Sequence, residues 1–141
     1  MRTLRILCLT FVLAVCGTSS AVRAEAAAAT PQAFLLSSAA ADFHKNMQPV
    51  PEHFRDVRLG HFKTESGEEQ YVLCGEYLPK QEKGKAKWTA FATVRTSDYE
   101  QWIGAQSQSF CKHPGTRWEG SLDLSPSLKV RLEALRGAES K

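Results

Sequence analysis

The fold of this chain is decided by one stretch, which reads Gln70-Tyr71-Val72-Leu73-Cys74-Gly75-Glu76-Tyr77-Leu78. It is rich in β-branched and aromatic residues, and turn-forming residues lie on both sides of it. Such a composition favours a β-strand. We therefore expect residues 70–78 to form the central strand of a small sheet, with Cys74 as its covalent anchor.

One further strand is expected on each side of this central strand. Residues 54–63 and residues 88–95 alternate between apolar and polar positions, as half-buried strands do. The connections at 64–69 and 79–87 are short and contain turn-forming residues. Consecutive strands joined by short loops predict an antiparallel meander.

Three helices are expected around the sheet. Apolar residues recur at helical spacing over residues 32–47. A capping-box pattern at residues 97–100 predicts a second helix that ends near Lys112. Ser125 as an N-cap, with Pro126 at the first helical position, and Gly137 as a C-terminal stop predict a third helix between them. Residues 118–124 form either a short edge strand or a loop. The expected fold class is α+β, with a three- or four-stranded antiparallel sheet packed by an N-terminal, a middle and a C-terminal helix.

The N-terminus has the order of a secretory signal peptide. Two arginines within residues 1–5 precede an apolar run over residues 6–16, and small residues lead up to Ala24. We expect cleavage after Ala24, with Ala26 as the fallback. The apolar run is short for a membrane span, which needs about 20 residues. Two alternatives stay open: a retained membrane anchor, and a lipoprotein attached through Cys16.

Removal of residues 1–24 leaves 117 residues, which is one domain's worth of chain. We expect a single domain at residues 32–137, with a flexible tail at 25–31 and a short tail at 138–141. The full chain has 18 lysines and arginines and 15 aspartates and glutamates, and three of the arginines lie in the signal segment. The processed chain therefore carries no net charge, which does not favour a nucleic-acid partner. No stable membrane span is expected after processing.

The cysteines predict one disulfide. Cys8 and Cys16 lie in the segment that processing removes, and Cys74 and Cys111 remain. An even pair in an exported protein is typical of a disulfide. This bond would join the central strand to the last turn of the middle helix.

No catalytic or metal site is expected. The four histidines lack the spacing of a zinc site, so no metal and no other cofactor is assigned: His44, His53, His61 and His113. No nucleophile motif or glycine-rich phosphate loop is present in the sequence. Glu76 should share a face with Cys74 and pair with Arg58 or Arg95 as a structural charge. A general acid or base at Glu76 is the alternative, because buried carboxylates also serve that role.

The candidate binding residues are basic and aromatic. A lysine-rich loop ends at a tryptophan, and a further tryptophan lies in a region of weak pattern: Lys80, Lys83, Lys85, Lys87, Trp88 and Trp118. A solvated loop explains the lysines equally well. Exposed tryptophans favour recognition of a partner.

Two of the expected strands resemble motifs of a known family. Residues 54–58 read Phe-Arg-Asp-Val-Arg, and residues 72–76 read Val-Leu-Cys-Gly-Glu with one intervening leucine. In these motifs the chain resembles a family of small uncharacterised exported proteins of α-proteobacteria. The segment before the first strand matches that family only at Pro49, and the lysine-rich loop replaces its asparagine-rich segment. The resemblance implies a small α+β fold and a periplasmic or secreted location, and it implies no activity.

We expect a non-catalytic binding or interaction module of the bacterial envelope. Its partner would be an envelope protein or an anionic envelope component, and one concrete form is an inhibitor of a cell-wall hydrolase. The alternative is an enzyme acting on envelope components. Titratable side chains that converge in one cleft would favour the enzyme. An open patch of basic residues and tryptophans would favour binding.

Overall fold

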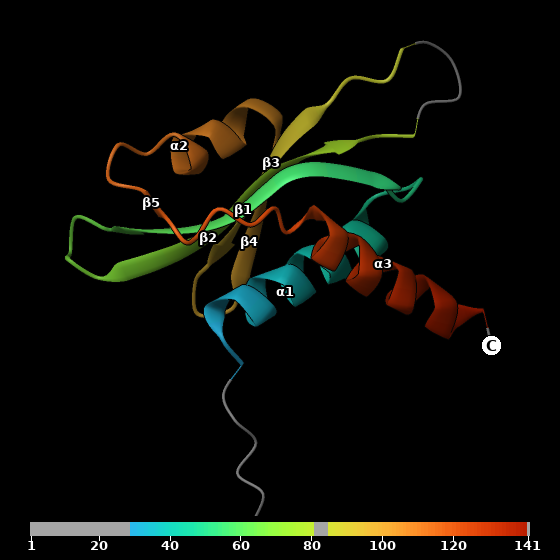
Figure 1. Cartoon of the computed structure of the whole chain (residues 1–141), viewed down its shortest axis with the longest axis horizontal. Helices are drawn as coiled ribbons and strands as arrows, with labels where there is room; N and C mark the ends of the chain where they lie inside the picture. The colour runs from blue at the N-terminus through green and yellow to red at the C-terminus, as the bar shows by residue number, and fades with distance from the viewer. Residues whose placement is uncertain (1–28, 81–84, 141) are drawn as a thin grey trace, which may run out of the picture.

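The computed structural model describes residues 29–80 and 85–140, and it has an α+β fold (Figure 1). In chain order its elements are α1 (Pro31–Asn46), β1 (His53–Lys63), β2 (Glu69–Leu78), β3 (Thr89–Arg95), β4 (Tyr99–Ile103), the 3₁₀ helix η1 (Gly104–Ser107), α2 (Gln108–Cys111), β5 (Arg117–Trp118) and α3 (Ser125–Glu139). The strands form one antiparallel sheet in the order β4-β3-β2-β1-β5. The sheet thus has five strands rather than three or four, and β2 is central, as expected. None of the helices in the described ranges is long and apolar enough to cross a membrane.

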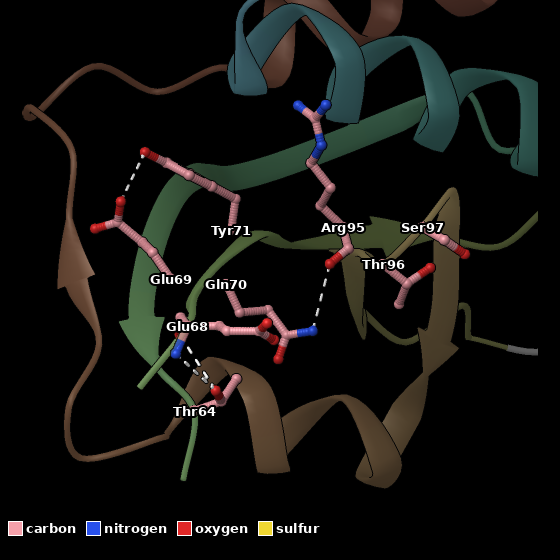
Figure 2. Close-up of a pocket in the computed structure, with 8 residues that line it drawn as sticks. All are labelled: Thr64, Glu68, Glu69, Gln70, Tyr71, Arg95, Thr96 and Ser97. Carbon is pink, nitrogen blue, oxygen red and sulfur yellow. Dashed lines mark hydrogen bonds between the residues drawn. The ribbon is translucent and has the colours of Figure 1, made fainter. Parts of the chain in front are cut away.

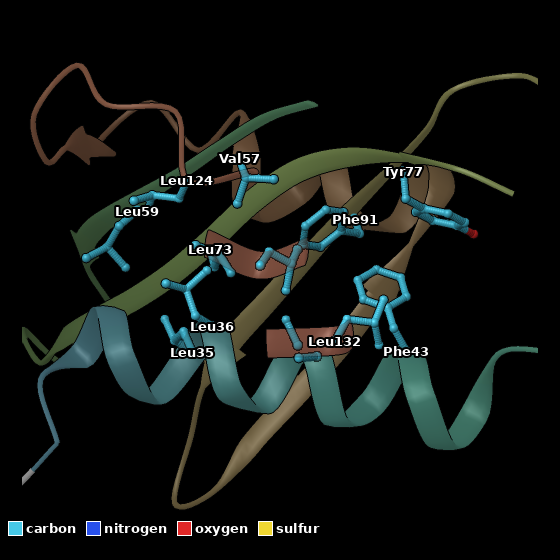
Figure 3. Packing of buried hydrophobic residues seen from close by; sticks show 13 residues of the cluster. Leu35, Leu36, Phe43, Val57, Leu59, Leu73, Tyr77, Phe91, Leu124 and Leu132 are labelled. Atoms are coloured by element: carbon cyan, nitrogen blue, oxygen red, sulfur yellow. The ribbon is translucent and has the colours of Figure 1, made fainter. Parts of the chain in front are cut away.

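The main core lies between the sheet and the two long helices. α1 and α3 lie on one face of the sheet, and the short α2 lies on the other (Figure 1). Figure 3 shows leucines and aromatic rings filling the space between α1 and the strands. Phe43 of α1 is fully buried, and its ring meets those of Phe54, Tyr77 and Phe91 at 5.3, 5.2 and 5.1 Å. Because rings at such distances pack favourably, this cluster fixes α1 on the sheet.

The expected disulfide is confirmed. Cys74 of β2 is bonded to Cys111 of α2, with 5.8 Å between their Cα atoms. The bond lies on the face opposite α1, where Cys74 packs with Val72, Ala92 and Val94. It therefore ties the short α2 to the middle of the sheet.

The expected middle helix, from the cap at Ser97 to about Lys112, is wrong over its first part. Tyr99–Ile103 forms β4, and only residues 104–111 are helical, as η1 and the one-turn α2. Ser97 does not cap a helix, because residues 96–98 make the turn between β3 and β4. Apolar residues occur at both odd and even positions of β4, since each face of the sheet is covered. A strand buried on both faces loses the alternation that distinguishes it from a helix.

The C-terminal helix begins and ends differently from the prediction. Ser125 is the first residue of α3 rather than its N-cap, and the helix continues through Gly137 to Glu139. The Asp123 carboxylate accepts a hydrogen bond from the Ser125 N–H at 2.9 Å, which satisfies a free donor at the helix start. Before it, β5 is limited to Arg117–Trp118, and residues 119–124 form a loop. The N–H groups of Glu119 and Leu124 in this loop still donate to carbonyl oxygens of β1, at 2.9 and 2.7 Å.

A β-bulge interrupts β1 and determines which side chains share a face. Arg55 pairs with Glu76, and Arg58 pairs with Cys74, so two residues of β1 lie opposite Gly75 alone. The first of these two, Asp56, has a φ of 54°. A Cβ on Gly75 would lie 2.7 Å from Val57 Cγ2, so glycine is required opposite the bulge. The extra residue places Arg55 and Arg58 on the same face of the sheet, whereas simple alternation would place them on opposite faces.

Candidate binding surface on the open sheet face

Two arginines and two tryptophans form a row on the sheet face that carries α2. The Arg55 guanidinium lies over the Trp88 ring, 4.3 Å from its centroid, and the Arg58 guanidinium lies over the Trp118 ring at 4.9 Å. We call these four residues the Trp–Arg row. Stacking of this kind contributes about 0.5–1 kcal/mol at exposed sites, so its main consequence is to hold the four side chains in place.

Glu76 has a different partner from those expected. Its Oε2 accepts a hydrogen bond from Arg55 Nε at 2.6 Å. Arg58 stacks on Trp118, and Arg95 lies over the Phe34 ring at 4.5 Å. Exposed ion pairs stabilise a fold little, but this one fixes the direction of the Arg55 side chain.

Trp118 is half-buried over a glycine. β5 pairs with β1 so that Trp118 lies opposite Gly60. A Cβ on Gly60 would lie 2.9 Å from both Trp118 Cε3 and Thr116 Cγ2. The missing side chain at position 60 therefore makes room for the indole, which is packed beneath and covered above by Arg58. Trp118 is thus a packed, half-buried member of the row rather than a fully exposed side chain.

On this face β1 is open at Arg55 and Arg58, which are both exposed. Further along the strand Phe62 is buried and stacks with His113. α2 and η1 contact β2, β3 and β4, whereas the arginines of the row project from β1. Arg58 is exposed and forms no ion pair with any residue in the described ranges. Because Glu76 balances Arg55, the free positive charge of the row is the Arg58 guanidinium.

Only some lysines of the lysine-rich loop add positive charge to the Trp–Arg row. Lys85 and Lys87 are exposed and come directly before Trp88, so they add positive charge at that end of the row. Lys80 is engaged elsewhere, since its Nζ lies 3.6 Å from Glu52 Oε1. Lys83 lies outside the described residues. The structure thus brings Arg58, Glu76, Trp88 and Trp118 onto one face.

A polar hollow of about 670 Å³ lies elsewhere, between the β1–β2 and β3–β4 turns (Figure 2). Its residues are bonded largely to one another: Gln70 donates to the Arg95 carbonyl at 3.3 Å, and the Tyr71 hydroxyl donates to Glu69 at 3.3 Å. Desolvation and the neighbouring Glu69 carboxylate raise the pKa of Tyr71. Figure 2 shows the Arg95 side chain turned away from the hollow toward the helices.

A histidine and a glutamate pair beside this hollow. His61 Nδ1 lies 2.6 Å from Glu69 Oε1, and the His61 ring stacks on Tyr71 with centroids 5.5 Å apart. His61 and Glu69 also line a second hollow of about 320 Å³, with Lys63 and Arg117. A histidine held by a carboxylate beside a hollow is an arrangement that acid–base chemistry can use.

The other histidines are dispersed. His44 Nε2 lies 3.1 Å from Glu139 Oε1, the His113 ring stacks on Phe62 at 4.3 Å, and His53 is exposed at the start of β1. Within residues 29–80 and 85–140, no three potential ligands are grouped to hold a metal ion.

No family model, curated protein or solved structure matches the chain. The function must therefore be inferred from the residues themselves. The residue of the row that sequence reasoning missed is Arg55. The sequence shows two arginines three residues apart, at positions 55 and 58. In a regular strand they would lie on opposite faces, and only the bulge places them on the same face.

Proposed function

We propose that this protein is a small exported, non-catalytic binding module of the bacterial envelope, and that its Trp–Arg row docks on an acidic protein surface. The observation that supports the proposal is the exposed Arg58 guanidinium, stacked on Trp118 and free of any ion pair in the described part of the chain. Tryptophan and arginine are the side chains most enriched where binding energy concentrates in protein interfaces.

The chemistry of the row favours an acidic protein over a lipid surface. Its side chains are already held by stacking and by the Arg55–Glu76 pair, so little rotamer freedom is lost on docking. A lipid surface would favour exposed aliphatic side chains, and the large ones, Leu122 and Val130, lie on the loop before α3 and on α3. Lys85 and Lys87 would speed the approach of an acidic partner rather than add much affinity.

A cell-wall hydrolase is one concrete partner. Glycoside hydrolases act through a pair of carboxylates beside the bond they cleave. A fixed guanidinium such as that of Arg58 is complementary to a carboxylate pair, and a neighbouring indole offers apolar contact area. Inhibition of such an enzyme is therefore the form of binding that this row suits best.

The proposal predicts a charge-dependent loss of binding. With the protein as bait in an envelope extract of the source cells, Arg58→Glu should lower recovery of an acidic envelope protein about tenfold, and Trp118→Ala should do likewise. Arg117→Glu is the matched control, because Arg117 lies on β5 next to Trp118 but pairs with His61 and so faces the other side of the sheet. Quantitative mass spectrometry of the retained proteins measures the difference.

Salt provides a second readout of the same proposal. Recovery should fall as ionic strength rises, because screening weakens attraction between exposed charges. Capture of the same proteins by the wild type and by Arg58→Glu would contradict the proposed role of the row. Loss of capture with Arg117→Glu alone would place the docking surface on the opposite face.

A second candidate, an enzyme acting on envelope components, draws support from the His61–Glu69 pair. Glu69 holds Nδ1 of the imidazole, which leaves Nε2 to exchange a proton with a substrate in the hollow shared with Lys63 and Arg117. This candidate predicts that the protein releases soluble fragments from purified peptidoglycan, and that His61→Asn lowers the rate at least about 100-fold. The exposed His53→Asn is the control. The binding module predicts no release by the wild type.

A further inference from the structure

The outer edge of β4 is an unpaired strand edge. β4 is the last strand of the described sheet, and its residues pair with β3 on one side only. Its sequence, Tyr-Glu-Gln-Trp-Ile, contains no proline or lysine, and its register with β3 shows no bulge. Proline, lysine and bulges are among the devices with which proteins commonly block the pairing of an edge strand with another chain. The one charged side chain of this five-residue strand is Glu100. The backbone donors and acceptors of this edge are therefore open to a further strand.

A hollow of about 490 Å³ runs beside this edge, between β4 and the end of α1. Asp42 and Met47 line it from the α1 side, and Tyr99, Gln101 and Ile103 line it from β4. Asp98 adds a second carboxylate, and no lysine or arginine is among the lining residues. A groove between an edge strand and a helix is the geometry in which an added strand places every second side chain against the protein.

Charge and hydrogen bonding indicate what fits there. Neither Asp42 nor Asp98 forms an ion pair with a described residue, so the groove carries two negative charges without a cationic partner. Asp42 Oδ1 accepts hydrogen bonds from Asn46 Nδ2 at 2.8 Å and from the Tyr99 hydroxyl at 3.4 Å, which hold the carboxylate in place. The Thr93 hydroxyl donates to Gln101 Oε1 at 2.6 Å, while Gln101 Nε2 is buried with no acceptor in the described chain. A buried donor without a partner is costly, so the polar groups of this groove are not fully satisfied within the described chain.

We propose that the β4 edge binds an extended peptide segment that carries a lysine or arginine among β-branched residues, as a sixth strand. The peptide backbone pairs with β4 and its basic side chain lies between Asp42 and Asp98. An apolar side chain two residues away, on the same face of the peptide strand, packs on Met47 and Ile103. A second copy of β4 has no basic residue between Tyr99 and Ile103 to meet these carboxylates, so self-pairing leaves them uncompensated. This site is separate from the Trp–Arg row and does not depend on the function proposed for it.

The test uses the pentapeptide acetyl-Val-Thr-Lys-Thr-Val-amide, in which the lysine and both valines share one face of a strand, and the ¹⁵N-labelled protein. Amide chemical shifts of β4 should change on titration, with a Kd of about 1 mM, while those of β5 at the other edge stay constant. A peptide with glutamate in place of lysine should bind at least about tenfold more weakly. The double variant Asp42→Asn, Asp98→Asn should bind the lysine peptide more weakly by a similar factor. Glu100→Gln is the matched control, because Glu100 lies at an even position of β4, on the face that carries Trp102.

Backbone methylation separates strand pairing from side-chain attraction. One peptide is N-methylated at both threonines, and another at the lysine and the valines. Since alternate residues of a strand direct their N–H groups to opposite edges, one methylated peptide should lose binding and the other should keep it. Equal binding of both, shifts confined to residues outside β4 and α1, or no shift at about 5 mM peptide would overturn the proposal. Retention of peptide binding by Arg58→Glu would show that the two sites are independent.

Discussion

Replacing Cys74 and Cys111 with serine is expected to lower the melting temperature of the protein by on the order of 15 °C. The bond closes a loop between positions that are 37 residues apart. In the chain-entropy description, a loop of this size contributes about 4 kcal/mol to the free energy of unfolding. That is a large fraction of the stability of a small domain, which is typically about 5–15 kcal/mol.

Removal of the disulfide should loosen mainly the segment from α2 to β5. α2 has only four residues and is too short to be stable by itself. The chain that leaves α2 continues to β5, whose two residues include Trp118 of the Trp–Arg row. Without the disulfide, we expect this segment to loosen before the α1 side of the sheet does, and binding through the row to weaken.

Reduction of the wild type provides the control for these substitutions. The reduced wild type should melt near the temperature of the double serine variant, and reductant should leave the variant unchanged. A double alanine variant separates loss of the bond from burial of a serine hydroxyl at position 74, where Cys74 is 6 % exposed. Peptide mapping under non-reducing conditions checks the pairing. Alkylated free thiols on both Cys74 and Cys111 would refute it.

The centre of the fold was predictable because its signals are local. The composition of residues 70–78 indicates a strand, and the order of strands along the chain places it in the middle of a meander. The disulfide could be predicted by counting, since only Cys74 and Cys111 lie beyond residue 24. α1 has the helical spacing of apolar residues, and it differs from the expected range by one residue at each end.

The binding surface was only partly predictable because register creates it. Trp88 and Trp118 could be singled out by residue type, but their partners depend on which strands neighbour them. The bulge at Asp56 leaves no clear mark in the sequence, yet it places Arg55 beside Arg58. β5, with two residues, is too short to show a periodicity. Long-range contacts therefore determine the row, whereas local patterns determine most of the elements on which it lies.

Replacing Asp123 with alanine is expected to lower the free energy of unfolding by about 1–3 kcal/mol and to weaken binding through the row. Asp123 Oδ1 accepts hydrogen bonds from the Val57 N–H at 3.1 Å, the Ser125 N–H at 2.9 Å and the Ser125 hydroxyl at 2.5 Å. One carboxylate thus joins the bulge of β1 to the start of α3. Its loss leaves the Val57 N–H with a weaker partner, the Ser125 hydroxyl at 3.3 Å. Since the bulge directs Arg58 to the open face, loosening it should also reduce capture of the acidic partner.

The pH dependence of this effect tests its cause. Desolvation raises the pKa of Asp123, but hydrogen bonds from Ser125 and Val57 outweigh it, and the folded-state pKa is lowered. A lowered folded-state pKa stabilises the fold above the unfolded pKa of about 3.9, and this contribution disappears as pH falls through the folded-state value. The difference in the free energy of unfolding between the wild type and Asp123→Asn should therefore be largest at neutral pH and should shrink as the pH falls below about 4. Denaturant unfolding across this range measures it. Glu65→Gln is the control, because Glu65 is exposed and has no side-chain partner within the described residues, so its difference from the wild type should stay near zero. A constant difference for Asp123→Asn would mean that packing at position 123, and not the carboxylate charge, holds the bulge against α3.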